Sequence, residues 1–361
     1  MYLFCSSMKN FFRLDMGGSR IFGLDVMRAV AIVLVLVYHS IPLSPFLEQV
    51  SKYLFLDGVT IFFVLSGFLI GQIILKTFVK NGINRNSLLN FWIRRWFRTL
   101  PNYFLFLTVL IILYKLFIPG FPLRGTIPYF IFSQNLFSPI KLGFFIESWS
   151  LCVEEWFYLV LPILLLVLNS FMKINLYRSI IICASLFILL SFIVRIITGS
   201  TGSVITRMDS IMFGVIGSLI YLRRRNWWLR FKGRFFAFGL ILLLLAQMMP
   251  LVNTPPFIVF ITYYPLINLS FALMLPMFNE TKTCSYGFLY KAITYMSLIS
   301  YSLYLINFSL IKKLLLDEFL NQYLSLTFQF FIFWILSISG SIIIYKYFEM
   351  PMTKLRDKLK I

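Results

Sequence analysis

The only histidine of the chain, His39, lies near the end of an apolar segment that begins with Arg28. The segment reads R-A-V-A-I-V-L-V-L-V-Y-H-S over residues 28–40. An imidazole changes charge near neutral pH and can take a proton from a hydroxyl group, which suits it to general-base catalysis. In a helix, the eleven-residue spacing puts both side chains on one face, about 16 Å apart along the axis.

Ionisable groups inside apolar helices usually face a polar cavity or pathway. The alternative is that Arg28 reaches one membrane surface while His39 forms a hydrogen bond at the other.

A pair of guanidinium groups occurs in R-R-W-F-R-T-L-P, residues 94–101. Arg95 and Arg98 are three residues apart and therefore lie on one side of a helix. Two guanidiniums on one face suit phosphate groups. Ordinary basic loading of a cytoplasmic helix end would also explain them.

Two adjacent carboxylates, Glu154 and Glu155, occur in E-S-W-S-L-C-V-E-E-W-F-Y-L-V-L-P, residues 147–162. We expect them to open a span on the external side, with Trp149 and Ser150 in supporting roles. The helix dipole accounts for one acidic residue but not for two. We therefore expect Glu154 to lie near His39 and to orient its ring or stabilise its charged form.

Two further motifs contain polar residues in apolar surroundings. T-R-M-D-S-I-M-F-G, residues 206–214, predicts a local ion pair between Arg207 and Asp209. In D-G-V-T-I-F-F-V-L-S-G-F-L-I, residues 57–70, Ser66 and Gly67 predict close helix packing in lipid.

Composition sets the fold class. Hydrophobic residues make up 60% of the chain and charged residues 13%, which excludes an ordinary soluble domain. We predict an all-α, polytopic membrane protein with about ten spans and no separate soluble domain. The four cysteines are scattered, so we expect neither a disulfide nor a metal framework. The predicted spans are about 24–44, 57–76, 100–118, 149–168, 177–198, 206–222, 235–251, 257–277, 293–311 and 327–347.

The predicted organisation is a cytoplasmic lead-in (1–23), a transmembrane domain (24–349) and a basic cytoplasmic tail (350–361). The first span is expected to act as an uncleaved anchor. Segment 119–148 is expected to be a partly buried external loop with a short helix. Lys and Arg concentrate in alternate loops, which predicts that both termini are cytoplasmic. This topology and anionic lipids explain the net charge of +20 without nucleic acid.

These residues together resemble the membrane-bound acyltransferase-3 family of bacterial O-acyltransferases, over about residues 20–352. Besides the motifs quoted above, the resemblance rests on three more. They are G-L-D-V-M-R (residues 23–28), S-Y-S-L-Y-L-I-N (300–307) and Y-F-E-M-P (347–351).

The resemblance implies a role for each motif. Arg28 and His39 would be the essential arginine–histidine pair, Arg95 and Arg98 the motif linked to acyl-coenzyme A, and Glu154 an essential acid. Arg28 would also contact the donor. We expect supporting roles for Trp149, Ser150, Glu155, Arg207, Asp209, Ser66 and Tyr301.

The chain departs from the family pattern in two places, because Thr60 stands at an often acidic position and Asn307 where a second histidine is common. The periplasmic hydrolase-like domain of some members is not found, so we expect acyl delivery to be completed within the membrane domain.

The resemblance implies transfer of an acyl group, expected to be acetyl, from cytoplasmic acyl-coenzyme A to a saccharide hydroxyl. The saccharide would be a surface or lipid-linked glycan, and the enzyme would reside in the bacterial inner membrane and need no metal. Two alternatives remain open: a transporter of a polysaccharide precursor, and a non-catalytic partner in polysaccharide assembly.

Overall fold

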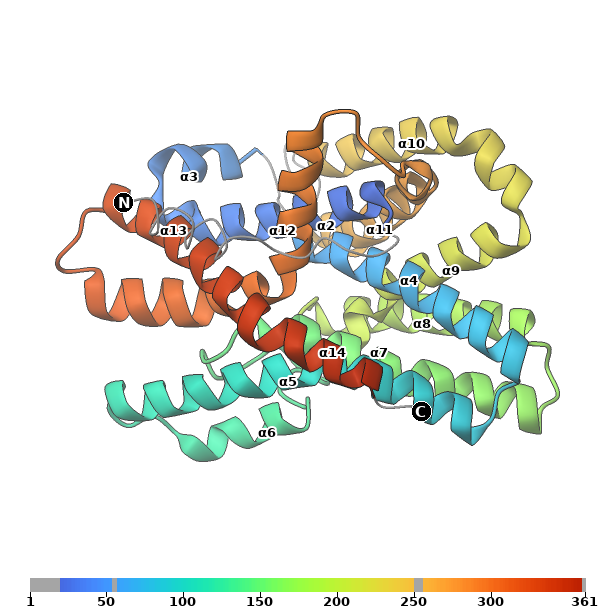
Figure 1. The fold of residues 1–361 in the computed structure, drawn as a ribbon, viewed down its shortest axis with the longest axis horizontal. Helices are drawn as coiled ribbons and strands as arrows, with labels where there is room; N and C mark the ends of the chain where they lie inside the picture. Colours follow the sequence, from blue (N-terminus) through green and yellow to red (C-terminus); the bar gives the residue numbers. More distant parts are fainter. Residues whose placement is uncertain (1–19, 54–56, 250–255, 359–361) are drawn as a thin grey trace.

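The computed structural model describes residues 20–53, 57–249 and 256–358, so most of the predicted lead-in lies outside the described residues. All regular secondary structure in these ranges is helical, which confirms the predicted fold class (Figure 1). The first half contains α2 (Phe22–Ser40), η1 (Ile41–Leu43), α3 (Pro45–Ser51), α4 (Gly58–Asn81), α5 (Arg85–Phe117), η2 (Leu123–Thr126), α6 (Ile127–Phe130), α7 (Ser148–Leu166) and η3 (Val167–Phe171). The second half contains α8 (Leu176–Thr198), η4 (Ile205–Arg207), α9 (Met208–Arg223), α10 (Arg225–Met248), α11 (Pro256–Glu280), α12 (Gly287–Ile306), η5 (Asn307–Leu320), α13 (Leu326–Ile344), η6 (Tyr345–Glu349) and α14 (Met350–Lys358).

Nine helical segments within the described ranges are long and apolar enough to cross a membrane, against about ten expected. The segment not among them is the one predicted at about 235–251. It is helical within α10, but that helix begins with a basic stretch that includes Arg230 and Arg234. Its charge-free part runs only from residue 235 to Met248. This is shorter than the roughly 20 residues that a bilayer core requires.

The connections between helices alternate between the two ends of the bundle. The α4–α5, α7–α8 and α9–α10 connections all lie at the right-hand end in Figure 1. α14 packs against α5. The same connections carry the excess of basic residues, so this arrangement agrees with the loop alternation expected from charge. Which end faces the cytoplasm stays a prediction.

Helix α5 begins at Arg85, well before the predicted start near residue 100. A capping box fixes this start: Ser87 N donates to Asn84 Oδ1 (2.9 Å) and Asn84 N donates to Ser87 Oγ (3.0 Å). Hydropathy marks only the apolar second half of the helix, which is why the sequence placed its start too late. As a result, the motif at residues 94–101 lies inside a continuous helix and not ahead of one.

Close packing of α4 on α9 holds the centre of the bundle together, as the Ser66–Gly67 motif predicted. A Cβ atom added to Gly67 would lie 1.8 Å from the carbonyl oxygen of Ile211. A Cβ atom on Gly214 would lie 2.0 Å from the carbonyl oxygen of Val64. Only glycine therefore permits these two backbones to approach so closely.

Apolar side chains form the core, and others face outward where lipid would cover them. Segment 119–148 contains η2 and α6, and its Phe121, Tyr129, Phe144 and Phe145 are buried. The prediction of a partly buried segment with a short helix is therefore confirmed.

On the outer surface, α8 and α13 present Ile181, Leu189, Phe331 and Ile335, each more than one-third exposed.

Candidate active site

The first cavity, here called the arginine cavity, has a volume of about 120 Å³ and is lined by three guanidinium groups. Arg28 comes from α2, while Arg95 and Arg98 come from α5. Arg98 is exposed, and Arg28 and Arg95 are partly buried. The remaining lining residues are Val59, Phe62, Phe63, Leu65, Ser66, Leu69, Thr99, Ser150, Leu151, Glu154, Tyr158, Ser300, Tyr301 and Tyr304.

Glu154 is the one acidic residue among the described residues that line the arginine cavity. Its Oε2 accepts a hydrogen bond from Tyr158 Oη (2.9 Å), and Tyr158 Oη is 2.6 Å from Ser66 Oγ. The Arg95 guanidinium lies over the Tyr158 ring, 5.2 Å from its centroid. One carboxylate facing three guanidiniums leaves the cavity with a net positive charge, which suits an anionic ligand.

The other predicted residues near this cavity support its walls. Thr99 Oγ1 donates to Glu155 Oε1 (2.8 Å), and Tyr301 Oη donates to the carbonyl oxygen of Thr99 (2.7 Å). Glu155 is buried and does not line the cavity, so it anchors α7 on α5. Tyr301 ties α12 to the same point on α5.

The second cavity, here called the imidazole cavity, has a volume of about 500 Å³ and contains His39. Its charged lining residues are Asp57, Glu147 and Arg207. The other lining residues are Val35, Tyr38, Gly58, Val59, Pro139, Ile140, Ile146, Trp149, Thr201, Gly202, Tyr264, Tyr304 and Phe308. Arg28 and His39 therefore reach two different cavities from one helix.

The hydrogen bonds of Asn307 define the tautomer of His39. Asn307 Nδ2 donates to the carbonyl oxygens of Leu303 (2.8 Å) and Tyr304 (2.9 Å), so both of its N–H groups are used. Asn307 Oδ1 lies 2.5 Å from His39 Nδ1 and can only accept. His39 Nδ1 therefore carries the proton, and Nε2 keeps the lone pair that a general base requires.

The structure does not bring Glu154 to His39, contrary to the expected pairing. Glu154 is the seventh residue of α7 and lines the arginine cavity, whereas His39 lines the imidazole cavity. Asn307, the first residue of the π-helix η5, takes the orienting position instead. π-helical turns often occur at functional sites.

Glu147 is a carboxylate of the imidazole cavity that the sequence did not single out. It directly precedes α7 and is 2% exposed. Ser309 N donates to Glu147 Oε1 (3.2 Å), and Ser309 Oγ donates to Glu147 Oε2. Burial raises the pKa of Glu147 to about 7, against the lowering effect of the Ser309 hydrogen bonds.

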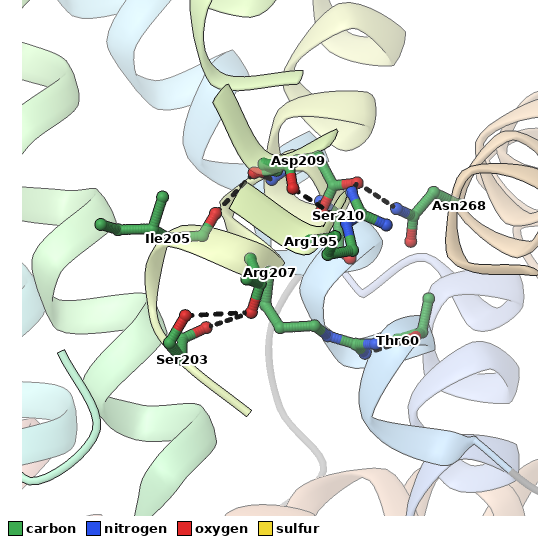
Figure 2. A network of polar contacts seen from close by, with 10 residues as sticks. Thr60, Arg195, Ser203, Ile205, Arg207, Asp209, Ser210 and Asn268 are labelled. Carbon is green, nitrogen blue, oxygen red and sulfur yellow. Dashed lines mark hydrogen bonds and ion pairs between the residues drawn. The ribbon is translucent and has the colours of Figure 1, made fainter. Parts of the chain in front are cut away.

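Arg207 and Asp209 do not form the predicted local ion pair, because each binds a partner on another helix (Figure 2). Side chains two positions apart in a helix are rotated by about 200° around its axis, so they point to nearly opposite sides. Arg207 Nη2 donates to Thr60 Oγ1 (2.6 Å) and lies 3.2 Å from Asp57 Oδ2. Asp209 pairs with Arg195 of α8 and accepts from Asn268 Nδ2 (3.3 Å).

Aromatic rings surround the Arg207 guanidinium. It lies 3.9 Å from the centroid of Tyr264 and 5.6 Å from that of Trp149. Both rings line the imidazole cavity, whereas Asp209 lies outside it. Arg207 and Trp149 therefore shape this cavity, and Asp209 stabilises the bundle next to it.

A comparison with known protein families gives a match over most of the chain. The model of a family described as "Acyltransferase domain" matches residues 21–346. The chain belongs to this family. The match includes every residue named above on both cavities, so the acyltransferase domain comprises the arginine cavity, the imidazole cavity and the helices between them.

Two curated relatives cover part of the acyltransferase domain. The "Peptidoglycan O-acetyltransferase OatA" of Listeria monocytogenes is 34% identical over 168 residues, which are 42% of this chain and 25% of the relative. The "O-acetyltransferase OatA" of Staphylococcus aureus is 28% identical over 216 residues, 55% of this chain and 34% of the relative. The aligned part thus spans about a quarter to a third of these relatives. No solved structure matches the chain.

Thr60 and Asn307 are the two departures from the acyltransferase family pattern. Each contacts a residue that lines the imidazole cavity. Thr60 lies between Arg207 and Asp57, and its hydroxyl donates to Asp57 Oδ2 (2.6 Å). Asp57 thereby places a carboxylate next to Thr60, which occupies the position that is often acidic. Asn307 contacts His39 directly, so the chain replaces a second imidazole with an amide that fixes the first.

Proposed function

We propose that the chain is a membrane O-acetyltransferase that moves an acetyl group from acetyl-coenzyme A to a saccharide hydroxyl. The observation that carries this proposal is the His39–Asn307 pair, which leaves Nε2 of the only imidazole free beside a cavity. The names of the relatives support O-acetyl transfer, and one of them supports peptidoglycan or a related cell-wall glycan as the acceptor.

The donor is assigned to the arginine cavity. Acyl-coenzyme A carries phosphates, and guanidiniums bind phosphates with charge-assisted hydrogen bonds. Arg95 Nε is buried and has no hydrogen-bond partner among the described residues, so a ligand could satisfy it. Following the charge-based topology, we place this cavity toward the cytoplasm of a bacterial cell and the protein in its cytoplasmic membrane.

The acceptor is assigned to the imidazole cavity. Trp149 and Tyr264 offer aromatic faces against which the apolar face of a sugar ring can pack. Arg207, Asp57 and Glu147 offer polar groups for its hydroxyls. A cavity of about 500 Å³ is large enough for a sugar unit of a longer glycan.

In the proposed reaction, His39 Nε2 takes the proton of the acceptor hydroxyl as its oxygen attacks the thioester carbonyl carbon. The tetrahedral intermediate collapses, the carbon–sulfur bond breaks, and the imidazolium returns the proton to the coenzyme A thiolate. The products are an O-acetyl ester and free coenzyme A, so the proton and the acyl group balance. Asn307 keeps Nδ1–H in place throughout, which keeps Nε2 available.

The test uses purified protein in proteoliposomes with acetyl-labelled acetyl-coenzyme A and a cell-wall glycan acceptor. The proposal predicts one coenzyme A thiol released for each alkali-labile acetyl ester formed on the glycan. Glycan that crosses the vesicle membrane without gaining a labelled ester would instead support a transporter and contradict the proposal.

A further inference from the structure

Two residues, Val59 and Tyr304, are the only described residues that line both cavities. Val59 comes from α4, and Tyr304 from α12. The arginine cavity and the imidazole cavity therefore adjoin at these two side chains. A group that moves directly from one cavity to the other passes Val59 and Tyr304.

Tyr304 is held in place at its ring and at its hydroxyl. Its hydroxyl donates to the carbonyl oxygen of Glu147 (3.0 Å) and is 2.7 Å from Ser150 Oγ. Phe62 contacts the ring edge-on, with 6.4 Å between centroids. Tyr304 is 6% exposed, so burial, ring packing and two hydrogen bonds fix one position of the side chain.

We propose that Val59 and Tyr304 form a septum that lets a short acyl group reach His39 and excludes longer ones. This inference rests on the proposed function, and it assigns acyl-length selection to a site distinct from the guanidiniums. The donor's coenzyme A part stays in the arginine cavity, and only its acyl end crosses the septum. The septum thereby sets the chemical class of the transferred group as acetyl.

Packing explains why these two residues can measure length. Val59 is β-branched and stiff at χ1, and Tyr304 cannot rotate away without losing both hydrogen bonds. Close-packed walls do not yield to an added methylene without strain. Discrimination by such contacts is about 10- to 200-fold for each methylene.

The first experiment compares acetyl- and butyryl-coenzyme A as donors for the full chain in proteoliposomes. Tyr304→Ala and Val59→Ala are each expected to raise the butyryl-to-acetyl ratio of kcat/KM by at least about 10-fold. Leu69→Ala is the matched control, because Leu69 lines the arginine cavity and not the imidazole cavity, and its ratio is expected to stay unchanged. Tyr304→Phe keeps the ring but loses both hydrogen bonds, and it is expected to give a ratio between those of the wild-type and Tyr304→Ala proteins.

The second experiment tests the septum without any catalytic readout. In a chain whose four natural cysteines are replaced, Val35→Cys places a thiol on the imidazole cavity only. A small anionic methanethiosulfonate is added from the side of the arginine cavity. Adding Tyr304→Ala is expected to speed labelling of this thiol at least 10-fold, whereas adding Leu69→Ala is expected to leave the rate unchanged.

The outcomes separate the septum from the proposed function. Absence of acetyl transfer by the wild-type protein would refute the proposed function, while the labelling experiment would still test the septum. An unchanged butyryl-to-acetyl ratio in a folded, active Tyr304→Ala protein would overturn the septum. So would a folded Tyr304→Ala protein that transfers neither group, or labelling that Tyr304→Ala does not accelerate.

Discussion

His39 Nδ1 lies 2.5 Å from Asn307 Oδ1, although the two residues are 268 positions apart in the chain. Because the amide nitrogen of Asn307 donates to two backbone carbonyls, its oxygen has to face the ring. An asparagine therefore selects the tautomer of the single histidine, a role that a carboxylate plays in many other acyl-transfer sites.

Substitution of Asn307 by leucine removes this selection and keeps the branched shape of the side chain. We expect kcat for acetyl transfer to fall about 10- to 100-fold, because part of the general-base contribution is lost. KM for the donor is expected to stay unchanged, since Asn307 does not line the arginine cavity. Steady-state kinetics on the purified protein measure both. A large rise in donor KM with unchanged kcat would contradict the tautomer argument.

The guanidinium pair is tested by Arg95→Gln combined with Arg98→Gln. Each lost charge-assisted hydrogen bond to phosphate is worth about 1.5–3 kcal/mol, so donor KM is expected to rise at least about 10-fold. Arg94→Gln is the matched control, because Arg94 is exposed, adjacent in sequence and absent from the lining of the cavity. Equal effects of the Arg94 variant and the double variant would rule out a specific donor site.

The buried ion pair of Arg195 and Asp209 is expected to stabilise the fold and not the reaction. Asp209→Asn leaves a buried guanidinium without its counter-ion, which costs about 3–5 kcal/mol. Replacing both residues by apolar ones is expected to recover most of the loss. Thermal unfolding in detergent measures each variant. Arg225→Gln is the control, since Arg225 is 41% exposed in its pair with Glu280 and is expected to contribute at most about 1 kcal/mol.

The buried carboxyl of Glu147 predicts a pH-dependent stability. Burial raises its pKa from the ordinary 4.5 of a glutamate to about 7, so the folded state binds more protons than the unfolded state between these values. The free energy of unfolding therefore falls as pH rises from about 5 to 7.5, by an amount on the order of 3 kcal/mol. Glu147→Gln does not titrate and is expected to remove the part of the slope that Glu147 contributes. Melting temperatures of both proteins at pH 5 and pH 7.5 check this, and parallel slopes would count against it.

Local patterns in the sequence were sufficient for much of this architecture. The apolar runs predicted all nine membrane-length helices of the described ranges and one further segment, at about 235–251, that is helical but not among them, because the length of an apolar run can be read from the sequence. The spacing of Arg28 and His39 predicted a common helix, and each side chain does reach a cavity. Gly67 predicted close packing because glycine has no side chain, and this property can be read from the residue alone.

Pairings between distant helices could not be predicted in the same way. Arg207 and Asp209 are neighbours in sequence, yet their partners, Asp57 and Arg195, come from other helices. Asn307 lies at a helix junction and carries no local sign that its amide meets His39. Glu147 opens a motif whose later acidic pair drew attention away from it. Such contacts depend on how helices pack, which one sequence does not specify.

The initial rate of the purified His39→Ala protein shows whether His39 Nε2 is the base of acetyl transfer. Binding of coenzyme A and the melting temperature serve as controls, because His39 does not line the arginine cavity. We expect O-acetyl transfer to fall at least about 100-fold while both controls stay near their wild-type values. Transfer at more than a tenth of the wild-type rate in a folded protein would contradict it.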